Sequence, residues 1–237
     1  FQNPSGVTLT LERRKEIVEI AAVYNVPIIE DDPYGPLRYE GEELTPLFVL
    51  DQQRLGVRDE DPVEVGNVIF TESFSKTLAP GFRVAFVVGP VEVIHALTQA
   101  KQGVDLHTSS FTQMVATYAA RDGFLQQHID HLRGVYKARR DLMLRLMEEH
   151  FPAALKWNRP QGGLFIWVEM PEGFNTTDLL AKAVEQQVAF VPGAPFFANG
   201  GGENIFRLNF SNATEAQIET GIKRLAEVLK AELAPVG

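Results

Sequence analysis

VIFTESFSK, residues 68–76, is the stretch of this sequence that decides its fold. Val68, Ile69 and Phe70 form a short apolar run, which predicts a buried strand. The run passes directly into a polar turn that contains two serines and Lys76. Because α/β sheets place functional residues just beyond the carboxyl ends of their parallel strands, this junction indicates an α/β fold with chemistry at one sheet edge.

Similar patterns surround this stretch. Two further strands are predicted at 26–29 and 84–88. Helices are predicted after Thr10, where apolar residues keep the i, i+3, i+4, i+7 spacing, and at 91–101 and 110–121. Residues 40–66 are polar, contain two prolines and a charge run, and are predicted to be mostly loop. The alternation of strands and helices is typical of a three-layer α/β sheet.

The second half of the sequence has a different pattern. A long helical stripe from Leu125 to Leu146 is predicted to bridge two domains. Beyond it, strands are predicted at 164–168 and 205–210 and helices at 177–187 and 214–233. The last helix has Thr214 and Gln217 at capping-box spacing. These residues indicate a separate α+β domain.

The composition excludes several classes of protein. Among the 237 residues are 22 Lys+Arg and 31 Asp+Glu, and the formal charge of −9 argues against a nucleic-acid partner. The absence of cysteine excludes disulfides, a thiolate nucleophile and cysteine-bound metal. The five histidines show no metal-ligand spacing. With no apolar run near the ~18 residues of a membrane span and no signal-peptide pattern, we expect a cytoplasmic protein without a membrane partner.

Lys76 is the candidate nucleophile. Its place between an apolar strand and serine hydroxyls predicts a partly desolvated amine, and burial lowers a lysine pKa and favours reaction with an aldehyde. Ser73, Ser75 and Arg83 supply donors suited to a phosphate. Together they indicate an aldehyde-bearing phosphorylated cofactor. Taken alone, Lys76 is consistent with a surface lysine and Arg83 with an ordinary ion pair.

A second candidate group follows the strand predicted at 26–29. Asp31 is suited to pairing with a pyridine nitrogen, which it would keep protonated. Tyr34 and Asn3 are suited to donating to a phenolic oxygen. The alternative interpretation of the acidic cluster 30–32 is a set of solvated loop acids or a site for a hard metal ion.

Six motifs of the chain resemble, in their order, those of the class I, fold-type I aminotransferases, which use pyridoxal 5′-phosphate. They are FQNPSG at 1–6, EDDPY at 30–34, SFSK followed by APGFR at 73–83, PQGGLFIW at 160–167, VPGAPFF at 191–197 and FRLNFS at 206–211. The resemblance covers the whole chain. The spacing of seven residues from Lys76 to Arg83 resembles the spacing in one subgroup of this family. That subgroup contains bacterial 2-aminoadipate aminotransferase of lysine biosynthesis.

The resemblance implies a role for each motif residue. The implied cofactor-binding residues are Asn3, Asp31, Tyr34, Ser73, Ser75, Lys76 and Arg83. Lys76 is implied to bind the cofactor covalently and to move a proton at the substrate α-carbon. Asp31 pairs with the ring nitrogen, Asn3 and Tyr34 hold the phenolic oxygen, and the two serines and the arginine bind phosphate. Arg207 is implied to bind the substrate carboxylate, together with Asn3.

The resemblance also implies a domain plan and a reaction. Residues 1–125 are expected to be the C-terminal portion of a large cofactor-binding domain with a mixed, mostly parallel sheet, 126–150 a bridging helix, and 151–237 a small α+β domain. The implied reaction, in a homodimer, transfers an amino group between an L-amino acid (2-aminoadipate, glutamate, or a hydrophobic or aromatic one) and a 2-oxo acid. Two alternatives stay open: the effector domain of a winged-helix transcriptional regulator, and a lyase on the same fold.

The sequence departs from the family at its start. Family members carry a long stretch before the asparagine motif, whereas this sequence begins with that motif at 1–6. We therefore expect a piece of a longer chain. Its sheet is expected to lack strands beside 26–29 and 68–70, and the piece alone is expected to bind the cofactor weakly.

Overall fold

The computed structural model describes residues 1–58 and 66–234. The chain forms two compact units. We call Thr8–Leu132 the Lys76 unit, and Phe1–Val7 together with Arg133–Gly237 the Arg207 unit. The first residues of the chain therefore group with its C-terminal part. The domain limits that the sequence suggested, near residues 125 and 150, stay a prediction.

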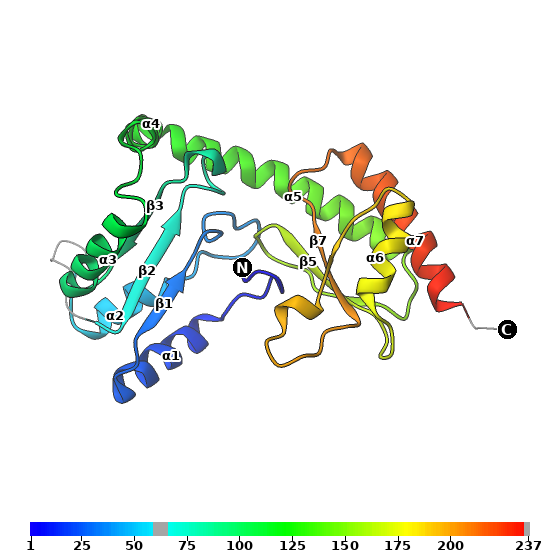
Figure 1. Cartoon of the computed structure of the whole chain (residues 1–237), viewed down its shortest axis with the longest axis horizontal. Coiled ribbons are helices and arrows are strands. Elements are labelled where there is room, and N and C mark those ends of the chain that lie inside the picture. Colours follow the sequence, from blue (N-terminus) through cyan, green and yellow to red (C-terminus); the bar gives the residue numbers. More distant parts are fainter. Residues whose placement is uncertain (59–65, 235–237) are drawn as a thin grey trace. The chain divides into compact units, whose positions relative to one another are not determined.

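A three-stranded sheet forms the centre of the Lys76 unit (Figure 1). Its strands are β1 (Ile28–Asp31), β2 (Val68–Ser73) and β3 (Ala85–Val88). β2 lies in the middle, parallel to β1 and antiparallel to β3, so the sheet is mixed, as predicted. The expectation that residues 68–70 lack neighbouring strands is wrong, because β1 and β3 pair with β2 on both sides.

Four α-helices lie wholly within the described part of this unit. They are α1 (Leu11–Tyr24), α2 (Leu47–Arg54), α3 (Val91–Val104) and α4 (Ser110–Ala120). The Thr10 hydroxyl accepts a hydrogen bond from the Arg13 N–H and begins α1, as predicted. Asn25, in the left-handed conformation at φ 51°, ends it.

Residues 40–66 were predicted to be mostly loop, and the helix that this prediction missed there is α2; 59–65 of that range lie outside the described residues. Leu47 and Leu50 of α2 are buried in one apolar cluster with Val18 of α1 and Val68 of β2. The carboxylate of Glu30 accepts hydrogen bonds from the first backbone N–H groups of α2. Packing and capping by distant residues therefore make a helix from a segment whose own sequence is unremarkable.

The helix predicted around Leu125–Leu146 is confirmed as α5 (Phe124–His150), which is 27 residues long. Its second half carries buried apolar residues, among them Met143 and Met147. Across residues 1–58 and 66–234, each helix is either too short or too polar to span a lipid bilayer.

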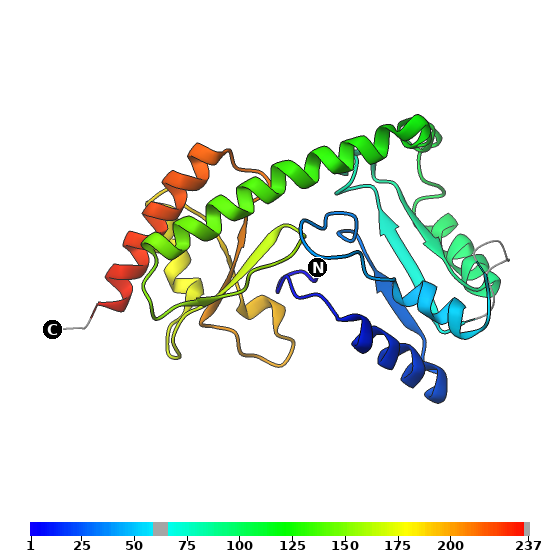
Figure 2. The same cartoon turned by 180° about the vertical axis from the view of Figure 1, so that it is seen from behind.

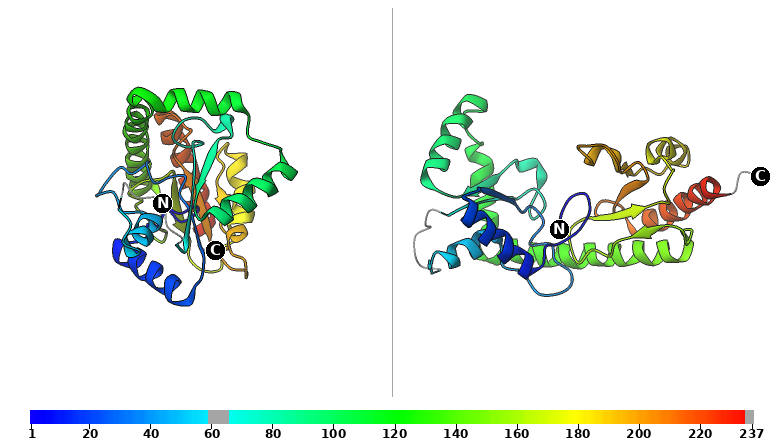
Figure 3. Two further views of the ribbon diagram at one scale, coloured as in Figure 1. Left: turned by 90° about the vertical axis from the view of Figure 1, so that its left-hand side faces the viewer. Right: turned by 90° about the horizontal axis from the view of Figure 1, so that it is seen from below.

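The Arg207 unit contains a four-stranded antiparallel sheet in the order β4-β5-β7-β6. The strands are β4 (Lys156–Trp157), β5 (Phe165–Glu169), β6 (Val191–Pro192) and β7 (Ile205–Asn209). Helices α6 (Thr176–Glu185) and α7 (Glu215–Leu233) complete the unit, with α7 beside the C-terminal part of α5 (Figures 2 and 3). The α+β pattern predicted from the sequence is therefore present.

The core of this unit follows the alternation of β7. Phe206 and Leu208 are buried, whereas Arg207 between them lies on the opposite face of the sheet. Thr214 and Gln217 form the predicted capping box at the start of α7. The apolar face of α7, which includes Ile222 and Leu225, is buried.

Replacing Gly221 by alanine is predicted to stabilise the Arg207 unit. Gly221 lies inside α7, and a Cβ added there meets no atom within 4 Å. Alanine loses less backbone entropy on folding, so Gly221→Ala is expected to raise the free energy of unfolding by ~0.5–1 kcal/mol. Urea denaturation measures this change.

Gly193→Ala is the control for that prediction. A Cβ at Gly193 lies 2.7 Å from the Gly202 carbonyl oxygen and 2.8 Å from that of Ile205, so this substitution is expected to destabilise the unit. A loss of stability in Gly221→Ala would contradict the prediction, because it would show that the fold needs the space beside Gly221 to stay empty.

Candidate functional site

The register of the three-stranded sheet places several predicted site residues at one edge. β1 ends at Asp31, which pairs with Thr71 of the parallel strand β2. β2 ends at Ser73, which pairs with Ala85 at the start of the antiparallel strand β3. Arg83 precedes that start by two residues. The carboxyl ends of β1 and β2 and the beginning of β3 therefore meet at the edge where α/β sheets bind ligands.

The turn after β2 holds two serines close together. The Ser73 hydroxyl donates to Ser75 Oγ at 2.8 Å, and the Ser75 N–H donates to Ser73 Oγ at 3.1 Å. The Phe74 N–H donates to the Val84 carbonyl at 3.1 Å, which ties the turn to the beginning of β3. Lys76 follows in the same turn and is half-buried. The turn at the sheet edge thus carries the two serine hydroxyls and Lys76.

Arg83 lies on the same edge in a left-handed conformation, at φ 54°. It directly follows the short 3₁₀ helix η1 (Pro80–Phe82), and its Nη1 donates to the Pro80 carbonyl at 3.4 Å. Its side chain is otherwise exposed. An exposed guanidinium that uses one terminal nitrogen in this bond keeps other N–H groups that are suited to binding an anion.

Asp31 is oriented by a residue that the sequence analysis missed. The Thr71 hydroxyl donates to Asp31 Oδ1 at 3.2 Å and to the Glu30 carbonyl at 3.3 Å. Asp31 is exposed, on the sheet face opposite to that of its neighbour Glu30, since successive strand residues alternate. The sequence analysis ended the predicted strand at Phe70 and placed Thr71 in the polar stretch that follows it. The register of β1 and β2 pairs Thr71 with Asp31.

The other two acids of the cluster have structural contacts. Glu30 accepts from the Leu47 and Phe48 N–H groups, each at 2.9 Å, and burial raises the pKa of its carboxyl. Asp32 Oδ1 accepts from the Gly35 N–H at 2.8 Å. The interpretation of these residues as solvated loop acids is wrong for Glu30, which lies in β1 and caps α2. Within the described residues, no group of His, Asp and Glu is arranged to hold a metal ion.

Tyr34, predicted to donate to a cofactor, lies in the turn after β1 and is buried. Its carbonyl accepts from the Leu37 N–H at 2.8 Å, which closes that turn. Asp31, Tyr34, Ser73, Ser75, Lys76 and Arg83 all belong to the Lys76 unit. The two remaining predicted site residues belong to the Arg207 unit.

In the Arg207 unit the structure brings those two residues into contact. Arg207 Nη1 donates to Asn3 Oδ1 at 2.5 Å. The guanidinium lies over the ring of Phe165, 4.2 Å from its centre, and 5.4 Å from the centre of the Phe196 ring. The sequence analysis did not identify either phenylalanine, although both fall in motifs that it quoted. Only the pairing of β5 with β7 brings Phe165 close to Arg207.

The N-terminal loop that carries Asn3 is fixed to the sheet. Asn158 Nδ2 donates to the Ser5 carbonyl at 2.6 Å, and Asn158 Oδ1 accepts from the Trp167 N–H at 2.8 Å. Within the loop, the Gly6 N–H donates to the Gln2 carbonyl at 2.6 Å. Asn158 therefore links Asn3's loop to β5, another role that the sequence did not reveal.

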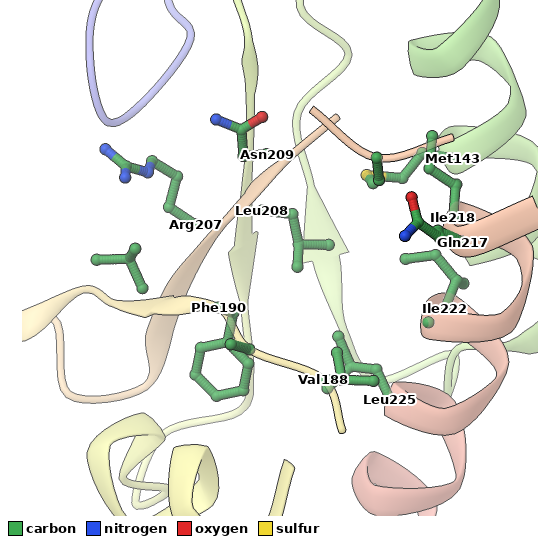
Figure 4. Close-up of a pocket in the computed structure, with 14 residues that line it drawn as sticks. Met143, Val188, Phe190, Arg207, Leu208, Asn209, Gln217, Ile218, Ile222 and Leu225 are labelled. Atoms are coloured by element: carbon green, nitrogen blue, oxygen red, sulfur yellow. The ribbon is translucent and has the colours of Figure 1, made fainter. Parts of the chain in front are cut away.

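A cavity of about 260 Å³ lies on the other side of β7 (Figure 4). Leu208 points into it, toward Ile222 and Leu225 of α7, whereas the Arg207 guanidinium points away from it. The cavity is mostly apolar, and Arg207 is the one predicted site residue that contributes to its lining. It is therefore separate from the group of polar residues around Asn3.

Comparison with known proteins gives a consistent result. The family described as "Aminotransferase class I and II" matches residues 1–225. Aromatic-amino-acid aminotransferase 1 of Thermococcus litoralis is 44% identical over 233 residues, which are 98% of this chain and 53% of that protein. The "Uncharacterized HTH-type transcriptional regulator YisV" of Bacillus subtilis is 32% identical over 97% of this chain and 45% of its own length.

A solved structure agrees with these similarities. It is the α-aminoadipate aminotransferase of Thermus thermophilus, complexed with N-(5′-phosphopyridoxyl)-L-leucine. The TM-score is 0.90 and the identity 38%, over 98% of this chain and 57% of that one. The chain thus spans about half the length of the relatives that it matches.

Glu72 is predicted to make stability depend on pH. It precedes Ser73 in β2, and burial, followed by the nearby Asp32 charge, raises the pKa of its carboxyl. The folded state therefore binds more protons than the unfolded state above pH ~4.5, so stability falls as the pH rises through this window. Glu72→Gln is expected to reduce that fall and to raise the free energy of unfolding at pH 8, measured by urea denaturation from pH 4.5 to 8.

Glu219→Gln is the control for Glu72→Gln. Hydrogen bonding to Lys223 lowers the pKa of Glu219, which is exposed on α7, so its removal is not expected to reduce the fall. An unchanged pH profile in Glu72→Gln would contradict the effect assigned to burial.

Proposed function

The chain belongs to the class I and II aminotransferase family, and we propose that it transfers an amino group between an L-amino acid and a 2-oxo acid with pyridoxal 5′-phosphate as cofactor. The observation that carries this proposal is the sheet register. It assembles the Asp31 carboxylate, the serine hydroxyls and the Lys76 amine at one edge. These groups come from two strands that are far apart in the sequence.

The residues at this edge fit the proposed cofactor. Ser73 and Ser75, already within 2.8 Å of each other, and the exposed guanidinium of Arg83 suit a phosphate. A carboxylate oriented by Thr71 suits a protonated ring nitrogen. When bound, the cofactor supplies an electrophilic aldehyde and a ring that withdraws electrons from the substrate α-carbon.

Lys76 has the central chemical role in the proposal. Lys76 is half-buried and follows the serine pair directly in the sequence, so its amine would be near a cofactor whose phosphate these serines bind. From that position Lys76 would take the proton from the substrate α-carbon and return it at the next stage of the cycle. The Asp31 carboxylate would pair with the ring nitrogen and favour its protonated form.

Arg207 and Asn3 are proposed to bind the substrate. A guanidinium binds a carboxylate with two parallel hydrogen bonds, which sets the orientation of the amino acid. The contact between Asn3 and Arg207 supports a shared role. The similarity to aminotransferases of aromatic amino acids and of α-aminoadipate supports these amino acids, with glutamate, as the substrate classes. It also supports a place in amino-acid metabolism, such as lysine biosynthesis.

We further propose that the protein acts as a cytoplasmic homodimer. Large apolar side chains are exposed on the Lys76 unit, among them Phe111, Met114 and Tyr118 of α4. An isologous contact is the commonest way to bury such a surface in an enzyme.

The similarity to the Bacillus subtilis regulator supports a second candidate function. In this alternative the same residues bind the cofactor as a sensor, and no amino group is transferred. Incubation with 2-aminoadipate, glutamate or an aromatic amino acid and a 2-oxo acid, followed by quantification of both products, separates the two. Two products in equal amounts support transamination, release of ammonia supports a lyase, and binding without turnover supports the sensor.

Lys76 is predicted to be the site of covalent attachment. Borohydride reduction of the cofactor-loaded protein, followed by peptide mapping, is expected to label the peptide that contains Lys76. Lys76→Ala is expected to lose the label and to lower turnover by at least ~10²–10⁴-fold, since it removes the proton-transfer group. Lys101→Ala, a change at an exposed lysine paired with Asp105, is the control and is expected to keep both. Label on another lysine would refute the assignment.

Arg207→Lys is predicted to weaken substrate binding without affecting the cofactor. It removes one arm of a bidentate contact, and a hydrogen bond to a charged group contributes ~1.5–3 kcal/mol. KM for both the amino acid and the 2-oxo acid is therefore expected to rise about tenfold or more. Steady-state kinetics measure this, and the cofactor absorbance spectrum is the control. Unchanged KM values for both substrates would exclude the carboxylate-binding role.

A further inference from the structure

Two aromatic rings hold the guanidinium of Arg207. Its central carbon lies 4.2 Å from the centre of the Phe165 ring and 5.4 Å from that of Phe196. Both distances are within the ~6 Å over which a cation is attracted to an aromatic face. Phe165 comes from β5, and Phe196 comes from the 3₁₀ turn η3 (Ala194–Phe196). Residues from two separate elements therefore restrict one side chain.

The Phe196 ring also contacts another aromatic side chain of the Arg207 unit. It makes a T-shaped contact with Trp167, with ring centres 5.8 Å apart and an angle of 74°. Trp167 is the direct partner of Arg207 in the β5–β7 register, so its side chain lies on the same sheet face. Trp167 also donates its backbone N–H to Asn158, which holds the loop of Asn3. The ring of Phe196 therefore belongs to the assembly that places Arg207 against Asn3.

The turn that carries Phe196 is held to β7 by its backbone. The Gly193 N–H donates to the Ile205 carbonyl at 2.7 Å, and the Phe196 N–H donates to the Gly193 carbonyl at 2.9 Å. No room exists for a Cβ at Gly193, which lies directly against the backbone of Gly202 and Ile205. The position of the Phe196 ring relative to Arg207 is thus set by main-chain contacts.

An arginine side chain loses rotamer entropy when it is fixed. A guanidinium already restricted by contact with two rings loses less of this entropy when it binds, and the rings do not compete for its N–H groups. Phe165 is buried and also belongs to the core, whereas Phe196 is 39% exposed. Replacing Phe196 is therefore expected to disturb the core less than replacing Phe165.

We propose that Phe196 is a positioning residue for Arg207: its ring, with that of Phe165, holds the guanidinium in the orientation that receives the substrate carboxylate. This inference rests on the proposed function. It makes carboxylate binding depend on the 194–197 turn as well as on the arginine.

The test compares Phe196→Leu with Phe196→Tyr and Phe197→Leu. Phe197 is the matched control, because it is the next residue and is equally exposed, at 39%, but packs against Gly202 instead. In the cofactor-loaded protein, Phe196→Leu is expected to raise KM for both substrates by about 3- to 10-fold, with kcat and the cofactor spectrum unchanged. Phe196→Tyr, which keeps the ring, and Phe197→Leu are expected to resemble the parent.

A second measurement reports the contact itself. In the ¹⁵N-labelled chain, the Arg207 Nε–H resonance, assigned through Arg207→Lys, is expected to carry a ring-current shift. Phe196→Leu is expected to reduce that shift and Phe197→Leu to retain it. Titration with a 2-oxo acid, followed through this resonance, is expected to give a weaker affinity for Phe196→Leu.

The outcomes separate this inference from the proposed function. If the parent binds a 2-oxo acid at Arg207 but transfers no amino group, the proposed function fails and the titration still decides the role of Phe196. Equal KM and affinity in Phe196→Leu and the parent would overturn the inference. Equal losses in Phe196→Leu and Phe197→Leu would also overturn it, because they would show disruption of the turn and not loss of the ring contact. No 2-oxo acid binding at Arg207 in the parent would overturn both.

Discussion

The pairing of β2 with a parallel strand on one side and an antiparallel strand on the other is the constraint on which the Lys76 unit depends. The parallel register brings the ends of β1 and β2 together, and the antiparallel register brings the beginning of β3 to the same place. Asp31, the serine turn and Arg83 therefore share one edge, although Asp31 and Arg83 are 52 positions apart in the sequence. A slip of one residue would turn Asp31 toward the face where Glu30 meets α2.

Strand alternation also gives different roles to neighbouring acids. Glu30 points toward α2 and caps its first turn, Asp31 points to the opposite face and bonds to Thr71, and Asp32 closes the turn after the strand. Each carboxylate is thus held by a different part of the structure. A helix that lacks its own capping residue depends on Glu30, while the adjacent Asp31 remains accessible to a ligand.

In the Arg207 unit a charged side chain lies against two aromatic rings. Water would satisfy the guanidinium more completely, but it would leave the side chain free to rotate. Phe165 and Phe196 restrict it at little electrostatic cost, because an aromatic face attracts a cation. Asn3 accepts one of its hydrogen bonds and so links the first residues of the chain to strand β7.

The sequence by itself determined the type of most elements and the family, because apolar periodicity, capping residues and motif order are local properties. The strand at 68–70, the helix begun by Thr10 and the capping box at Thr214 are examples. Only the tertiary structure decided that residues 47–54 form a helix, that Thr71 orients Asp31, and that Phe196 lies over Arg207. Each of these depends on atoms from segments distant in sequence, which meet through strand pairing and core packing and leave no periodic signal in any one segment.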